Sequence, residues 1–173
     1  MTRMFTRRGW LALIAALIAA LGAVMTLPLA AARLPEIFLV NESRSLPRGL
    51  YVRRFNAAPD RGRLVAFVQP EAARSYLAGL GAPPDMMLLK RVAAVGGDHV
   101  CRRRDGLHAP GVRAPVKSQD RAGAPLPGWT ECRFLEADEI FLLGDTPESF
   151  DSRYFGPVRR RDTKGVFATA ATW

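Results

Sequence analysis

An uncharged apolar segment near the N-terminus constrains this chain more than any other feature. Residues 10–32 contain no charged side chain. As a helix rising about 1.5 Å per residue, the segment would span roughly 34 Å, which is enough to cross the hydrocarbon core of a bilayer. The sequence therefore predicts a transmembrane anchor at residues 10–32 and leaves residues 33–173 to fold as one domain.

The flanking charges predict how this anchor is oriented. Arg3, Arg7 and Arg8 precede it, so residues 1–9 should stay in the cytoplasm and the domain should lie on the far side of the membrane. A cleavable signal peptide is the alternative, since residues 29–32 are small enough for a cleavage site. The apolar stretch is much longer than the ~7–15 residues of a usual signal-peptide core, which favours an uncleaved anchor.

The formal net charge of +9 comes almost entirely from arginine, since the only lysines are Lys90, Lys117 and Lys164. A basic chain can bind nucleic acid or anionic lipid. No nucleic-acid motif accompanies the charge, and with the high alanine content it indicates a compositional bias. We therefore expect no nucleic-acid partner. The arginine runs at residues 102–104 and 159–161 could still lie near anionic lipid.

The chain has two cysteines, Cys101 and Cys132. In an exported domain they meet an oxidising compartment, where pairing is expected. A zinc site built from these cysteines with His99 and His108 is the alternative, but the spacing matches no standard ligand pattern. The sequence therefore predicts a Cys101–Cys132 disulfide, with no metal or cofactor.

The pattern of apolar residues and turns after the anchor is mostly that of β-strands. A helix is expected at residues 70–80, where Pro70 suits a first turn and Gly79 and Gly81 end the pattern. Four prolines make residues 103–128 loop-like. The sequence predicts a mainly β, antiparallel domain with one short helix. Strands are expected at residues 36–40, 50–55, 64–68, 86–95, 99–102, 132–135, 140–143 and 165–173.

Lys90 interrupts the apolar run at residues 86–92. Side chains alternate along a strand, so Lys90 shares its face with Leu88 and Val92. An amine desolvated in this way can lose several pKa units from about 10.4 and can then take the proton of a serine hydroxyl. The alternative is a strand lysine that extends to solvent and blocks aggregation at a sheet edge.

Ser45 opens the tight turn Ser45-Leu46-Pro47-Arg48-Gly49, shortly after the apolar segment. Serine before proline and glycine is also common in ordinary turns. Residue type and position nevertheless make Ser45 and Lys90 a candidate nucleophile and base. Together they point to a serine–lysine hydrolase that works at a membrane surface.

A third block of polar residues follows an expected apolar strand and covers residues 144–156. Such a run can hold a loop in place through a network of carboxylates and arginines. We expect Asp145 and Arg153 to have this structural role.

Four segments, in order along the chain, together resemble the type I signal peptidase superfamily of serine–lysine proteases. They cover residues 41–51, 61–67, 89–98 and 144–156. The likeness extends over the anchor and nearly the whole exported domain. It implies a signal-peptidase-like β domain at residues 33–173, on the periplasmic side of a bacterial inner membrane.

Two departures from the general signal peptidase pattern refine this resemblance. In the Ser45 turn, proline stands two residues after the serine and is followed by Arg48-Gly49. This turn, and the segment at residues 125–133, are similar to the TraF-type conjugative transfer peptidases. The last box is one residue shorter than usual, with Thr146-Pro147 in place of asparagine, which leaves the role of Asp145 open.

The resemblance also implies roles for individual residues. Ser45 matches the nucleophile and Lys90 the general base. The Ser45 N–H and the Ser43 hydroxyl match the donors that face the developing oxyanion. Ser149 matches the serine that orients the lysine amine. Asp151 matches an acidic position of TraF-type enzymes and is predicted to belong to the catalytic set.

The function that these matches imply is a membrane-anchored serine endopeptidase that processes exported precursors. A TraF-type enzyme would act on a conjugative pilin precursor, by hydrolysis or by cyclising acyl transfer, beside inner-membrane lipid and conjugation or type IV secretion components. A housekeeping signal peptidase and a non-catalytic scaffold of a secretion apparatus are the alternatives. The proline-glycine turn speaks against the first, and the complete set of polar site residues against the second.

Overall fold

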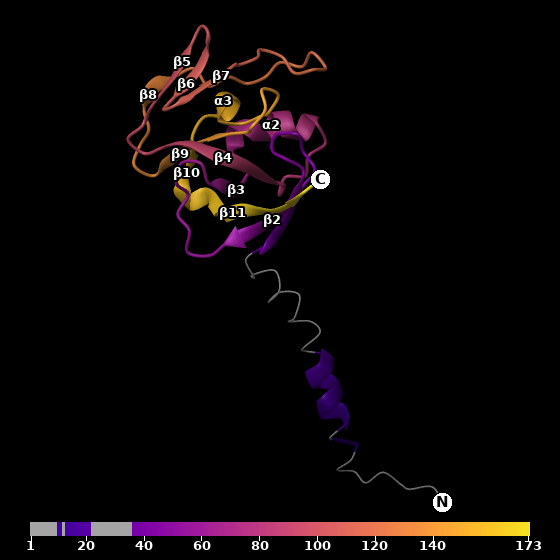
Figure 1. Cartoon of the computed structure of the whole chain (residues 1–173). Coiled ribbons are helices and arrows are strands. Elements are labelled where there is room, and N and C mark those ends of the chain that lie inside the picture. The colour runs from indigo at the N-terminus through magenta and orange to yellow at the C-terminus, as the bar shows by residue number, and fades with distance from the viewer. Residues whose placement is uncertain (1–9, 12, 22–35) are drawn as a thin grey trace, which may run out of the picture. The chain divides into compact units, whose positions relative to one another are not determined.

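The computed structural model describes residues 10–11, 13–21 and 36–173 (Figure 1). It divides into two compact units, residues 1–35 and 36–173. In the first unit, residues 10–11 and 13–21 are helical. Residues 12 and 22–32 of the expected anchor lie outside the described part. Within the described residues, no helix has the length and apolar character needed to span a bilayer.

The second unit is built on a seven-stranded sheet in which every neighbouring pair is antiparallel. The strand order is β1-β2-β11-β3-β4-β9-β10. The mainly antiparallel β architecture is therefore as predicted, with strand ends shifted by one or two residues. The strands are β1 (Phe38–Asn41), β2 (Gly49–Arg54), β3 (Leu64–Val68), β4 (Met87–Val95), β9 (Glu139–Leu143), β10 (Val158–Arg159) and β11 (Thr163–Thr172).

A second sheet of four strands includes residues 106–109 and 112–114, where the sequence predicted a loop; residues 115–128 form no strand, as expected. Its order is β7-β6-β5-β8. Pro110 and Gly111 connect β6 to β7 as a two-residue turn, and Gly111 has a φ of 71°. Proline and glycine therefore mark a hairpin turn here, where the sequence suggested an irregular loop. The strands are β5 (His99–Arg103), β6 (Gly106–Ala109), β7 (Val112–Ala114) and β8 (Cys132–Phe134).

Helices are few and short in this unit. The expected helix is α2 (Glu71–Gly79), with Pro70 as its N-cap. The prediction of a single helix is wrong, because α3 (Ser152–Phe155) and the 3-10 turn η1 (Arg160–Asp162) also form. A single turn of helix has no apolar repeat to reveal it. Asp151 caps α3 by accepting a hydrogen bond from the Arg153 N–H.

Apolar side chains on both faces of the large sheet form the core. One cluster joins α2 and α3 to strands β3, β4 and β9, and includes Leu88 and Val92. A second, on the β2, β3 and β11 side, includes Leu46, Tyr51 and Leu89. Strand β4 is therefore covered on both faces along much of its length. This position in the middle of the sheet keeps the β4 side chains out of water.

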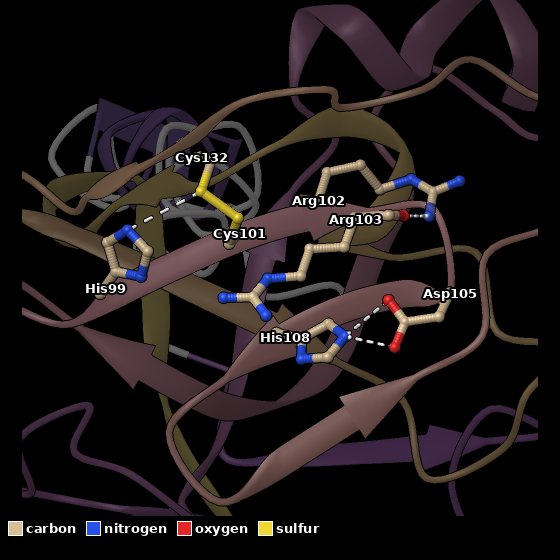
Figure 2. Close-up of a disulfide and its surroundings, with 7 residues drawn as sticks. All are labelled: His99, Cys101, Arg102, Arg103, Asp105, His108 and Cys132. Atoms are coloured by element: carbon tan, nitrogen blue, oxygen red, sulfur yellow. Dashed lines mark hydrogen bonds and ion pairs between the residues drawn. A yellow bond between two sulfur atoms is a disulfide. The ribbon is translucent and has the colours of Figure 1, made fainter.

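The predicted disulfide is present and ties the small sheet together (Figure 2). Cys101 of β5 and Cys132 of β8 lie directly opposite each other, 31 residues apart in sequence. Because their sulfurs are bonded to each other, neither is a thiolate available to a metal. His108 instead lies 2.9 Å from the Asp105 carboxylate.

Candidate active site

Ser45 lies in the loop that joins β1 to β2. The ends of this loop are fixed, because Asn41 and Gly49 are paired across the two strands. A side chain at Gly49 would overlap the carbonyl oxygen of Ala171, so glycine is needed for β2 to approach β11 this closely. Within this loop, the side chain of Ser45 is only 8% exposed and lies at the wall of a cavity.

Lys90 lies at the centre of β4, opposite Val65 of β3. Leu88 and Val92, two residues to either side, belong to one apolar cluster, as the alternation of the strand predicts. Lys90 itself is 5% exposed, and its Nζ donates a hydrogen bond to Ser45 Oγ over 2.7 Å. The two candidate residues therefore come together although they are 45 residues apart in sequence.

Burial sets the ionisation of the amine. Loss of solvent lowers the pKa of Lys90 to about 8, since a charged amine is penalised in apolar surroundings. Arg153 acts in the same direction, while the negative charges of Asp151 and Asp145 raise the pKa. A substantial fraction of the amine is then neutral at mildly alkaline pH. A neutral amine 2.7 Å from a hydroxyl can accept its proton.

A second hydroxyl lies beside the first. Ser43 Oγ is 2.9 Å from Ser45 Oγ and also 2.7 Å from Asn41 Oδ1. Ser43 is exposed toward the cavity that Ser45 borders. Its position suits a hydroxyl that would donate to an oxyanion formed at Ser45.

The segment after β9 closes over the serine turn. The Asp145 N–H donates to the Ser45 carbonyl oxygen over 2.7 Å. At Gly144, an added Cβ would lie 2.8 Å from that same carbonyl oxygen and would overlap Ser149, so only glycine fits. Ser149 is buried beside the cavity, and its hydroxyl has no hydrogen-bond partner among the residues that the structure describes. Ser149 therefore makes no hydrogen bond to Lys90 among the described residues, and its role in orienting the amine stays a prediction.

Asp151 and Arg153 form a fully buried ion pair. Arg153 Nε and Nη2 each lie 2.8 Å from an Asp151 oxygen, and Asp151 also accepts the Gly144 N–H over 2.9 Å. In the described structure Asp151 makes no hydrogen bond to Ser45 or Lys90. Its contacts position the loop and its negative charge raises the pKa of Lys90, while its place in the catalytic set stays a prediction. The remaining Arg153 N–H groups donate to the carbonyl oxygens of Pro115, Thr146, Pro147 and Ser149.

Asp145 takes part in a separate and more exposed pair. Its two oxygens accept from Arg91 Nε and Nη2, each over 2.8 Å. The network expected for Asp145 and Arg153 therefore consists of two pairs, each with its own partner. Both pairs brace the segment at residues 144–153, which lies against the Ser45 turn.

The cavity beside Ser45 and Lys90 has a volume of about 510 Å³. Its walls are largely apolar and come from β1, α2, the residues at the start of β4, the Ser45 turn and residues 146–150. Leu39, Val40, Met86 and Leu88 are among the apolar residues that line it. Such a cavity can accept apolar side chains of an extended polypeptide that brings a carbonyl to Ser45.

Two side chains that shape the serine turn were not predicted from the sequence. The Asn41 amide donates toward the carbonyl oxygens of Ser43, Leu46 and Pro47, and the Tyr51 hydroxyl also donates to Pro47 over 2.6 Å. Asparagine at a strand end before a serine-containing turn is a signal for such bonds. No local signal marks Tyr51, because it reaches Pro47 from the next strand.

The chain is similar to known proteins over most of its length. A family model described as signal peptidase, peptidase S26, matches residues 8–172. Two plasmid transfer proteins TraF from Escherichia coli are 35% identical over 147 residues and 34% identical over 148, and each match covers 78% of this chain and 82% of the relative.

A solved structure is also similar. The signal peptidase I of Enterococcus faecalis V583 is 23% identical with a TM-score of 0.39, over 65% of this chain and 98% of that one. The family model spans nearly all of the chain, and both TraF relatives exceed 30% identity over most of their length. The chain therefore belongs to the signal peptidase S26 family.

Proposed function

We propose that this protein is a serine endopeptidase in which Ser45 is the nucleophile and Lys90 the general base. The observation that carries the proposal is the 2.7 Å contact between Lys90 Nζ and Ser45 Oγ, made by an amine buried in the centre of the sheet. Family membership supports peptidase chemistry in general. The contact supports this particular pair of residues.

The reaction would proceed by acyl transfer. Neutral Lys90 takes the Ser45 proton as Oγ bonds to the substrate carbonyl carbon, and the carbonyl oxygen becomes negatively charged. The Ser45 N–H and the Ser43 hydroxyl then donate to this oxyanion. When the peptide bond breaks, Lys90 gives its proton to the leaving amine, and an ester remains on Ser45. Water or a substrate amine releases the acyl group and restores the Ser45 hydroxyl.

The substrate that we propose is the precursor of a conjugative pilin. The two E. coli relatives carry the name plasmid transfer protein, and the Ser45 turn has the proline and glycine spacing of the TraF-type enzymes. An exported pilin precursor would meet the enzyme at the inner membrane, with residues 10–32 as the anchor and the domain in the periplasm. The apolar walls beside Ser45 suit an extended chain with small or apolar side chains.

Mass spectrometry of a cleavage reaction tests this function. Purified full-length protein is incubated with a pilin precursor from the same conjugation system, and the products are weighed. A shortened pilin is expected with the natural protein and not with Ser45→Ala. Hydrolysis gives a linear product, whereas attack by the substrate's own amine gives a cyclic one that is lighter by one water.

A second substrate separates the pilin enzyme from a general signal peptidase. A precursor of an ordinary secreted protein is offered under the same conditions. Preferential cleavage of the pilin precursor supports the proposal. Efficient cleavage of the general precursor with an intact pilin precursor would contradict it.

A further inference from the structure

Asn41 lies at the end of β1, four residues before Ser45, and is 9% exposed. The loop after it leaves several backbone carbonyls without strand partners. Asn41 Nδ2 lies 3.0 Å from the Ser43 oxygen and 3.1 Å from the oxygens of Leu46 and Pro47. One side chain therefore bonds to carbonyls on both sides of Ser45.

These three contacts also fix which way the amide points. Carbonyl oxygens only accept hydrogen bonds, so the nitrogen of Asn41 must face them and Oδ1 must face the other way. On that side Oδ1 lies 3.3 Å from the Ser43 nitrogen and 2.7 Å from Ser43 Oγ. Asn41 thus presents a fixed acceptor to the hydroxyl of Ser43.

The fixed position of Asn41 Oδ1 determines which hydroxyl of the site donates to which acceptor. Since Oδ1 cannot donate, the Ser43 proton points to Asn41 in the resting protein. Ser43 Oγ then accepts from Ser45 over 2.9 Å, and Ser45 Oγ accepts from protonated Lys90 over 2.7 Å. When Lys90 is neutral, Ser45 turns its proton toward Nζ. Donation by Ser43 to an oxyanion breaks the bond of its hydroxyl to Oδ1, but the contacts of Asn41 with the Ser43 backbone N–H and carbonyl oxygen remain and keep Ser43 Oγ in place.

We propose that Asn41 is a positioning residue that holds the Ser43 hydroxyl where it can donate to the oxyanion, and that it acts on catalysis through Ser43. This inference rests on the proposed roles of Ser45 and Ser43. It goes beyond them, because it gives the orientation of the oxyanion donor to a side chain outside the proposed pair, four residues before the nucleophile. Loss of Asn41 should therefore lower kcat and leave KM nearly unchanged.

A double-mutant cycle tests whether Asn41 acts through Ser43. kcat and KM are measured for the natural protein, Asn41→Ala, Ser43→Ala and the double variant. Loss of an oxyanion donor costs about 10²-fold in kcat or more. We expect Ser43→Ala and Asn41→Ala each to show a loss of this order, and the double variant to be no slower than Ser43→Ala by more than about threefold. Losses that multiply in the double variant would overturn the proposal and leave Asn41 only a role in holding the turn.

Two further variants serve as a substitute for Asn41→Ala and as a control. If Asn41→Ala does not fold, Asn41→Gln replaces it, because it keeps an amide nitrogen that can donate to the carbonyl oxygens of the turn. Its extra methylene displaces the contacts with Ser43, so kcat should fall in the natural background and change little in Ser43→Ala. Gln69→Ala is the matched control, since Gln69 is also a buried amide that bonds a carbonyl, that of Pro83, over 2.7 Å. Its effect should be the same in both backgrounds.

Failure of this inference can be told apart from failure of the proposed function. Ser45→Ala and Lys90→Ala are assayed with the same substrate. If either keeps full activity, the peptidase assignment itself is wrong. If both are inactive while the Asn41 and Ser43 losses multiply, only the role of Asn41 is wrong.

Discussion

At the scale of single residues, the ionisation of Lys90 decides whether Ser45 has a base. The amine is buried in the middle of β4, where a positive charge is poorly solvated. The same burial that destabilises the charged form makes the neutral form available near pH 8. Catalytic competence and a local cost in stability therefore have one physical origin.

The cleavage rate should follow this ionisation. Since the pKa of Lys90 is lowered to about 8, kcat/KM should rise roughly tenfold per pH unit below that value and level off above it. The measurement is a pH profile of peptide cleavage with the free enzyme. A profile of kcat/KM that levels off only near pH 10, the pKa of a solvated lysine, would contradict the argument that burial lowers the pKa of Lys90.

Replacing the amine should stabilise the fold at neutral pH. The pKa of Lys90 is lower in the folded protein than in the unfolded chain, so the unfolded chain binds the proton more readily. Below about pH 8 the folded protein carries the full penalty, and the penalty disappears as the pH rises through 10.5. Lys90→Met should therefore raise stability by an amount on the order of 1–3 kcal/mol at pH 7, and by less at pH 10.

Urea unfolding at both pH values measures this difference. Lys164→Met is the matched control, because Lys164 is exposed on β11 and removing it should change stability little. A Lys90→Met variant that is less stable than the natural protein at pH 7 would contradict the argument.

The sequence allowed Ser45 and Lys90 to be proposed as nucleophile and base because each has an informative local setting. Ser45 lies in a tight turn, and Lys90 lies in an apolar strand. Sequence reasoning could not assign partners to Asp145 and Arg153. Asp145 pairs with Arg91 of β4, and Arg153 with Asp151. The first pairing depends on β4 and β9 becoming neighbours, which a run of polar residues does not encode. The second is local and depends on the turn of α3, which no apolar repeat reveals.

At the scale of elements, strands with strong apolar alternation were predictable to within one or two residues. Strand β4 is the clearest example, expected at residues 86–95 and found at Met87–Val95. The hairpin of β6 and β7 was missed because each strand is short and its turn contains a proline and a glycine. Tertiary pairing with β5 stabilises it, and its own propensity is weak.

The disulfide should stabilise the small sheet and leave the chemistry intact. It closes a loop of 31 residues, which in the chain-entropy model is worth about 3–4 kcal/mol. Replacing Cys101 and Cys132 by serine should lower the melting temperature, while cleavage persists below it, because Lys90 and the two strands that flank the Ser45 loop belong to the large sheet. Thermal unfolding and peptide cleavage of the double-serine variant measure both effects. An unchanged melting temperature would contradict the predicted stabilisation.

At the scale of the whole molecule, the proposed function needs the peptidase domain and its substrate on the same side of a membrane. The positive residues before the apolar segment predict a cytoplasmic N-terminus and a periplasmic C-terminus. Reporters fused after Trp173 should be active only when the reporter works in the periplasm. Fusions that lack residues 1–32 serve as the control and should be active only with a cytoplasmic reporter. A cytoplasmic signal from the full-length fusion would contradict the predicted topology.

Sequence reasoning at this scale depended on resemblance, because distant segments must be recognised together. The serine turn, the β4 lysine and the segment at residues 144–156 are far apart along the chain. In the structure they meet at one cavity, where Lys90 Nζ contacts Ser45 Oγ and Asp145 N–H donates to the Ser45 carbonyl. Composition and periodicity alone would have predicted the sheet. They would not have predicted that these three segments lie together at the cavity.

The most direct test of the Ser45–Lys90 pair is the kcat/KM of Lys90→Arg toward the pilin precursor. A guanidinium keeps its proton, so it cannot take one from Ser45 even where it fits the site. Lys90→Arg should be as inactive as Lys90→Ala and Ser45→Ala, and the Ser45→Ala, Lys90→Arg double variant no worse, because the two residues act as one unit. If Lys90→Arg keeps substantial activity while circular dichroism shows an intact fold, Lys90 is not the base.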